Sequence, residues 1–334
     1  MRSHNPGLQR PRKCGSPRPV AASAFKLQCG VTAIPHPDKA SRGGEDAYFF
    51  CDTALGVADG VGGWAEEGVN PAEFAQGLMN VAKAYYAAAA EPSAAEENSG
   101  SEVSPVVDDS GASYAGEGGA PARPSSMEAL KRAHAETQKP GSSTACIVQL
   151  DPETGALDSS NLGDSGFVVI RDGQLVMKAD FQEHFFDCPY QLASLRFVPE
   201  TDQATDAAVL TGQVEAGDLI VLGSDGLFDN VPMEDILLVV RAVEAQGGDL
   251  GGDGGPNAKA EAIASALGEM AFANSQNPEY ESPYALEARR QGYELNFFEK
   301  LQAAKFTEGG LQLGQITGGK MDDITVVVGV VEEA

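Results

Sequence analysis

Acidic residues stand at the ends of apolar, strand-like runs in this sequence, and this placement limits its possible folds more than any other feature. In LGVADGVGGW (55–64), an apolar run ends at Asp59 and Gly60. An isolated Asp-Gly pair is most often a turn. However, a carboxylate held against a buried strand costs several kcal/mol unless it is paired or bound to a metal.

The same arrangement recurs along the chain. Other acidic residues at such junctions are Glu45, Asp46, Asp164, Asp225, Asp322 and Asp323. Few Arg or Lys residues stand at matching positions, so we expect the carboxylates to converge on hard divalent cations. Oxygen ligands without suitable His or Cys favour Mg²⁺ or Mn²⁺ over zinc. Two such ions bridged by one carboxylate can generate hydroxide and hold a phosphoryl oxygen.

Charge is distributed unevenly over the 334 residues. Residues 1–37 contain six Lys or Arg and no acidic residue, whereas the remainder carries 17 basic and 49 acidic residues. An acidic body repels phosphate backbones, so we expect no nucleic acid partner. No apolar run approaches twenty residues, so we expect a soluble chain without a membrane span.

The basic start and the cysteines indicate the compartment. The start resembles an organellar transit peptide for chloroplast or mitochondrion, and the alternative is a disordered basic tail at 1–25. The five cysteines are scattered without a CxxC pair, which indicates neither a disulfide framework nor a zinc finger.

Periodicity predicts both helices and strands. Helices are expected at 70–90, 127–137, 233–245 and 258–273. Strands are expected at 26–33, 47–51, 55–58, 142–150, 156–162, 166–171, 174–178, 208–214, 218–222 and 323–331. Those from 142 to 222 are expected to form one antiparallel meander. Low-complexity insertions are expected at 91–126 and 246–257.

Six motifs in order resemble those of the metal-dependent serine/threonine protein phosphatases of type 2C. They are GEDA (44–47), ADGVGGW (58–64), SSTA (142–145), NLGDSG (161–166), GSDGLFDN (223–230) and GGKMDDITVVV (318–328). HFFDCPYQL (184–192) and SPYA (282–285) resemble the organelle-associated branch of that family. The resemblance implies one α/β domain over 26–334, a four-layer αββα sandwich of two antiparallel sheets with helices outside. It also implies a site in a cleft at one end of the sandwich.

The resemblance further implies hydrolysis of phosphoserine and phosphothreonine in proteins by a metal-bridging hydroxide. Asp59 matches the carboxylate that bridges two metals, and the Gly60 carbonyl matches a ligand of one of them. Asp225 and Asp322 match two further ligands.

Supporting acidic positions follow from the same resemblance. Glu45 and Asp46 match a pair that acts through metal-bound waters. Asp164 matches the site of a third, weaker metal, and Asp323 is assigned a supporting role.

Two positions depart from the family pattern. Many relatives carry a phosphate-binding Arg where this chain has Ser41, and Arg42 is one residue late. Arg42 is therefore either a phosphate contact or a solvated loop residue. Val61 replaces a His proposed as general acid in some members, so the leaving-group proton must come from metal-bound water or another group.

Weaker candidates and rival functions complete the expectations. His184 is expected to be structural, and Trp64 is expected to anchor its loop by packing. The rival functions are a pseudophosphatase that binds phosphoproteins and a phosphatase of small phosphorylated metabolites. The expected partners are phosphoproteins, and the chain is expected to be a monomer.

Overall fold

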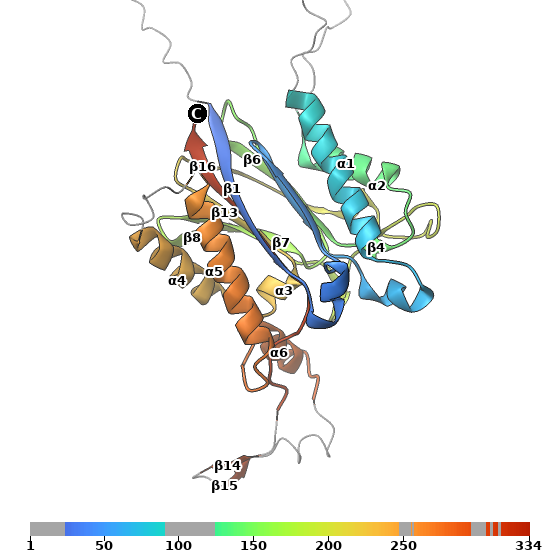
Figure 1. Cartoon of the computed structure of the whole chain (residues 1–334), viewed down its shortest axis with the longest axis vertical. Coiled ribbons are helices and arrows are strands. Elements are labelled where there is room, and N and C mark those ends of the chain that lie inside the picture. Colours follow the sequence, from blue (N-terminus) through green and yellow to red (C-terminus); the bar gives the residue numbers. More distant parts are fainter. Residues whose placement is uncertain are drawn as a thin grey trace, which may run out of the picture.

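Two five-stranded antiparallel sheets pack face to face, with helices on both outer faces (Figure 1). The computed structural model describes residues 24–90, 124–246, 255, 257–294, 305–307, 310–312 and 315–334. Helices α1 and α2 cover one sheet, and α4 and α5 cover the other. The predicted αββα sandwich is confirmed.

The first sheet has the order β1-β16-β13-β7-β8. Its strands are β1 (Phe25–Ile34), β16 (Ile324–Glu333), β13 (Leu219–Gly223), β7 (Gly166–Arg171) and β8 (Gln174–Lys178). The second sheet has the order β12-β6-β5-β3-β2. Its strands are β12 (Ala208–Gln213), β6 (Ala156–Leu162), β5 (Ala145–Leu150), β3 (Ala54–Ala58) and β2 (Ala47–Cys51).

The expected single meander from 142 to 222 is wrong. The chain leaves the second sheet after β6, enters the first at β7, returns for β12 and crosses again to β13. Strands β5, β7 and β13 are buried at nearly every position. A continuous apolar run indicates only that both faces of the strand are covered by other residues. It does not indicate which of the two sheets the strand joins.

The principal helices begin and end close to the predicted limits. They are α1 (Ala72–Ala90), α2 (Ser126–Glu136), α4 (Met233–Ala245) and α5 (Ala258–Ser275). Among the described residues, no helix is both long and apolar enough to span a bilayer. The shorter elements are η1 (Pro37–Arg42), η2 (Gly62–Glu67), β4 (Ser142–Ser143), β9 (Glu183–Phe185), β10 (Cys188–Pro189), β11 (Leu192–Ala193), η3 (Ala204–Asp206), α3 (Asp225–Phe228), α6 (Pro283–Arg290), β14 (Lys305–Thr307) and β15 (Gly310–Gln312).

Three predicted segment limits need correction. Phe25, assigned to the basic tail, begins β1 and pairs with Glu333. Ser126, assigned to the first insertion, is fully buried at the start of α2, where its hydroxyl donates to Asp158 Oδ2 at 2.9 Å. Asn257, assigned to the second insertion, accepts a hydrogen bond from the backbone N–H of Cys29. The rest of these segments lies largely outside the described residues.

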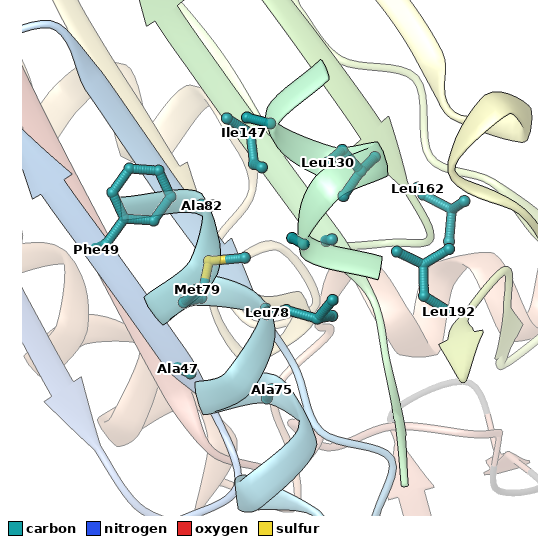
Figure 2. Packing of buried hydrophobic residues seen from close by; sticks show 14 of the residues in the cluster. Ala47, Phe49, Ala75, Leu78, Met79, Ala82, Leu130, Ile147, Leu162 and Leu192 are labelled. Carbon is teal, nitrogen blue, oxygen red and sulfur yellow. The ribbon is translucent and has the colours of Figure 1, made fainter. Parts of the chain in front are cut away.

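Three apolar layers hold the sandwich together. One lies between the two sheets, and each of the others lies between a sheet and its helices. In Figure 2, Met79 of α1 lies on the side of Phe49, and Leu78 points away from that ring; both belong to one cluster with Phe49 and Ile147 of the sheet. The four described cysteines are free thiols, as expected, and Cys14 lies outside the described residues.

Strand register brings the acidic junctions to one end of the sandwich. Ala47 at the start of β2 pairs with Ala58 at the end of β3. In the other sheet, Gly223 at the end of β13 pairs with Gly166 at the start of β7. Gly223 also pairs with Val326 near the start of β16. The residues flanking these ends therefore meet in space although they are far apart in sequence.

The layer beneath α1 gives a stability prediction. Leu78→Ala removes a fully buried side chain and leaves a cavity, so the free energy of unfolding falls by about 2–5 kcal/mol. The matched control is Leu238→Ala on α4, whose side chain is 58% exposed and whose loss costs far less. Urea unfolding of both variants measures the difference, and equal losses would contradict the assignment of Leu78 to the core.

Candidate metal centre

Asp59 is held at the end of β3 by the segment that joins β4 to β5. Its backbone N–H donates to Thr144 Oγ1 at 3.1 Å, and the Thr144 N–H donates to the Asp59 carbonyl at 3.0 Å. The next residue, Gly60, lies against backbone, since a Cβ there would be 2.6 Å from the Glu45 carbonyl oxygen. Only glycine permits this approach, which keeps the Gly60 backbone beside the acidic pair.

The hydroxyl of Ser224, the residue before Asp225, holds Asp46 in place. Ser224 Oγ donates to Asp46 Oδ2 at 2.7 Å and accepts from the Thr325 N–H at 3.1 Å. The turn from β13 into α3 is tightly packed here, because a Cβ on Gly226 would lie 2.0 Å from the Asp323 carbonyl oxygen. One serine thus fixes Asp46, from the second sheet, to the strand ends of the first.

Asp323 organises the loop before β2. Its buried carboxylate accepts from the backbone N–H groups of His36 at 2.7 Å and Glu45 at 2.8 Å. It also accepts from Lys39 Nζ at 3.2 Å. These partners occupy both of its oxygens.

Two lysines pair with the carboxylates, and the expectation that matching cations are scarce is therefore wrong. Lys39 Nζ lies 2.7 Å from Glu45 Oε2 and 3.3 Å from Asp322 Oδ1. Lys320 Nζ lies 2.6 Å from Asp225 Oδ2 and 3.0 Å from both Asp229 Oδ2 and Asp187 Oδ1. Neither lysine flanks an apolar run, so inspection of the junctions alone does not find them.

The carboxylates repel one another strongly. Burial raises the pKa of Asp59 well above its ordinary value, and Asp225, Asp46 and Asp322 raise it further, in that order. Asp164 contributes to the same shift. Such mutual effects require the side chains to be close neighbours, so the structure brings the predicted aspartates together.

The pKa values of several neighbouring carboxyl groups are also raised. Burial first, and nearby carboxylates next, raise the pKa of Asp46 to about 7 and of Asp164 to about 8. The pKa values of Asp322 and Asp229 rise to about 6 and about 7, mainly through burial. A carboxyl whose pKa is raised on folding stabilises the fold at low pH, and that stabilisation is lost as pH rises through the raised value. The folded site thus accumulates unfavourable negative charge between about pH 4 and 8.

The donor atoms suit a hard divalent cation. Asp46, Asp164 and Asp225 each have an Oδ1 atom that is buried without a hydrogen-bond partner. Across the described ranges, no group of three or more His, Cys, Asp or Glu side chains is already arranged to hold a metal ion. The lysine ammonium groups already occupy part of the carboxylate set. We infer that the residues fit Mg²⁺ or Mn²⁺ once the lysines release the oxygens that they hold.

Arg42 lies at the edge of the carboxylate cluster. It ends η1, its side chain is 49% exposed, and its guanidinium lies 3.6 Å from Glu45 Oε1. This is a loose contact, so the guanidinium has room to move. Val61 bonds only through its backbone in the described part of the chain: its N–H donates to the Ser142 carbonyl, and its carbonyl accepts from the Trp64 N–H.

The weaker candidates have structural partners. Trp64 Nε1 donates to Ser142 Oγ at 2.7 Å, which fixes η2 against β4. His184 Nε2 lies 3.0 Å from Asp202 Oδ2, and its ring stacks on Tyr190. Both arrangements agree with the structural roles expected from the sequence.

Sequence reasoning missed four residues with a place in the centre: Lys39, Lys320, Ser224 and Asp229. The last three lie inside the quoted motifs GGKMDDITVVV and GSDGLFDN. A sequence motif alone does not distinguish a residue that orients a metal ligand from the other residues of the motif. Their contacts identify them only in three dimensions.

Comparison with known proteins connects this geometry to a family. Residues 52–272 match the family model described as Stage II sporulation protein E (SpoIIE). The chain is 35% identical over 307 residues to "Probable protein phosphatase 2C 26" of Arabidopsis thaliana, covering 91% of this chain and 83% of that protein. It is 36% identical over 327 residues to "Probable protein phosphatase 2C 1" of Oryza sativa subsp. japonica, covering 97% and 81%.

A solved structure supports the same assignment. The photosystem II phosphatase PBCP superposes with a TM-score of 0.68 at 34% identity, covering 92% of this chain and 100% of that one. Sequence, fold and the converging carboxylates agree, and the chain belongs to the protein phosphatase 2C family of metal-dependent serine/threonine phosphatases.

Proposed function

We propose that Asp59, the Gly60 carbonyl, Asp225 and Asp322 hold two Mg²⁺ or Mn²⁺ ions, with which this chain dephosphorylates phosphoserine and phosphothreonine in proteins. One observation carries the proposal. Burial raises the pKa of Asp59, and it is raised further by four carboxylates that come from both sheets: Asp225, Asp46, Asp322 and Asp164. Such a concentration of charge is costly for a fold unless a cation offsets it.

The neighbouring acids take auxiliary roles in this proposal. Glu45 and Asp46 would help to hold the ions through water, and hydrogen bonds from the chain orient these two side chains or their backbone. Ser224 fixes Asp46, while Asp323 fixes the backbone at Glu45. The unpartnered Oδ1 of Asp164 is the donor proposed for a third, weaker ion.

Cations bound here would supply Lewis acidity toward water and the phosphoryl oxygens. The chain itself orients the donors and presents Arg42 at the edge of the cluster. We propose that Arg42 turns from its loose contact with Glu45 to a phosphate oxygen, because guanidinium groups bind phosphate with two parallel hydrogen bonds.

Asp59→Asn tests the proposed metal ligand. Phosphopeptide turnover with Mn²⁺ falls by about 100-fold or more, a scale seen when metal-site residues are disturbed. The metal-free variant unfolds at a temperature no lower than wild type, because a repelling charge is gone. Malachite-green phosphate release and thermal unfolding measure the two effects.

The matched control for that substitution is Asp172→Asn. Asp172 is exposed in the β7–β8 turn with φ of 50°, a conformation that asparagine also adopts. The control keeps wild-type turnover. If Asp59→Asn also kept wild-type turnover and its response to Mn²⁺, the proposed ligand set would be wrong.

Lys320→Met tests competition between the ammonium group and a cation. Lys320 pairs with Asp225 at 2.6 Å, so removing its charge strengthens Mn²⁺ binding by about tenfold, or ~1.4 kcal/mol. The metal-free variant unfolds at a lower temperature because Asp225 and Asp229 lose their counter-ion. Isothermal titration of metal-stripped protein measures the affinity. Lys139→Met, at a 62% exposed lysine paired with Glu73, should leave it unchanged, and weaker binding by Lys320→Met would contradict the competition.

We further propose that the protein acts in the chloroplast. The acid-free basic segment 1–37 supports an organellar address, and the structural relative PBCP is named as a photosystem II phosphatase. Residues 1–40 fused to a fluorescent protein should colocalise with chlorophyll in leaf cells, whereas a fusion of residues 24–40 should not. Fluorescence in mitochondria or cytosol would contradict the proposal.

A further inference from the structure

A pocket of about 430 Å³ opens directly beside the carboxylate cluster. Asp164 and Asp229 belong to its lining and also to the charged network of the metal centre. One wall is the segment from Phe181 to Asp187, which contains β9, and another is α6. A phosphorylated residue at the metal centre would place its neighbours in the substrate at this opening.

Aromatic rings form much of the pocket surface. Phe181 is 39% exposed and packs on Phe228 with ring centroids 5.4 Å apart. On the other side, Phe186 packs on Tyr284 at 5.2 Å. Ring faces attract cations as well as apolar groups, so these walls suit a long side chain with a charged end.

Negative charge exceeds positive charge in the lining. It contains five carboxylates and two cationic side chains, and both cations already have partners. Arg290 makes two hydrogen bonds to Glu287, at 2.7 and 2.9 Å, and Lys178 lies over the Phe181 ring at 5.3 Å. Lys320, from outside the lining, pairs with Asp187 and Asp229. Among the described residues, Asp164 and Glu183 are therefore the lining carboxylates left without an ion pair.

Glu183 is one of the carboxylates that give the pocket lining its excess of negative charge. One of its oxygens accepts from the Asp187 N–H at 3.2 Å. Burial raises the pKa of Glu183, and the charges of Asp187 and Glu287 raise it further. A cation entering the pocket would relieve this repulsion.

The chain already holds one ammonium group on the same surface. Lys320 Nζ lies 3.0 Å from Asp187 Oδ1 and 5.2 Å from the centre of the Tyr284 ring. Lys320 is not part of the pocket lining, yet three of its partners are: Asp187, Asp229 and Tyr284. The contacts of Lys320 with the Asp187 carboxylate and the Tyr284 ring thus show how this surface binds a basic side chain.

We propose that this pocket is the subsite that binds a lysine or arginine side chain of the phosphoprotein, close to the phosphorylated residue. The inference rests on the proposed function and names the substrates it selects. A basic side chain would lay its aliphatic stem along Phe181 and Phe186 and direct its charge toward Glu183 and Asp187. Substrates with acidic neighbours at that position would be disfavoured by repulsion.

Matched phosphothreonine peptides test the subsite. They differ only at one position, within three residues on either side of the phosphothreonine, which is Arg, Leu or Glu. For at least one position, we expect kcat/KM with Mn²⁺ to be about tenfold higher for Arg than for Glu. High salt should reduce this ratio, because the pocket is open to solvent.

Variants assign the preference to the pocket. Glu183→Gln keeps the side-chain shape and removes one charge, so the Arg-to-Glu ratio should fall to about a third or less. Glu128→Gln removes an exposed charge on α2 and should keep the wild-type ratio. Tyr284→Leu provides a second test, since it should also lower the ratio by removing the ring.

The outcomes separate two kinds of failure. Equal turnover of all peptides, or a preference for Leu or Glu, would overturn the subsite and leave the phosphatase function standing. A wild-type ratio in both Glu183→Gln and Tyr284→Leu would overturn its assignment to this pocket. No turnover of any peptide or of p-nitrophenyl phosphate would overturn the proposed function and the subsite together.

Discussion

Electrostatic repulsion between carboxylates at one end of the sandwich is the constraint on which the rest of the structure depends. Asp59, Asp46, Asp225 and Asp322 come from four strand ends, and the last three lie close enough to Asp59 to raise the energy of charging it. Three apolar layers are needed to hold such groups together, since no attraction among them would do so. The free energy gained by burying the large apolar core therefore offsets the repulsion at the site.

The fold limits this repulsion by local means. Lys39 and Lys320 each contact more than one carboxylate, and the hydroxyl of Ser224 fixes Asp46. A divalent cation would bind the same carboxylate oxygens, so these contacts compete with metal binding. The metal-free molecule can thus remain folded while its ligands stay available to metal.

Much of this was predictable from sequence, and particular residues show where prediction ended. Asp59 and Asp225 were identifiable because a carboxylate beside an apolar run is costly wherever it occurs. The strands around Val168 and Val221 were identifiable as buried, but burial on both faces could not assign a strand to a sheet. Lys39 and Lys320 stand in polar loops, where a lysine is ordinary, so only proximity in space reveals their role. The family resemblance, carried by six ordered motifs, gave the architecture that periodicity alone left open.

The close backbone packing at Gly60 and Gly226 has a consequence for how this enzyme can diversify. Any side chain at either position would collide with main-chain atoms of another loop, so the floor of the centre tolerates almost no substitution. The pocket wall at Glu183 is exposed, and no close backbone contact restricts the side chain there. During evolution, substitutions are therefore expected mainly at the pocket surface, where they can change which substrates bind. The packed backbone at Gly60 and Gly226 is expected to stay the same.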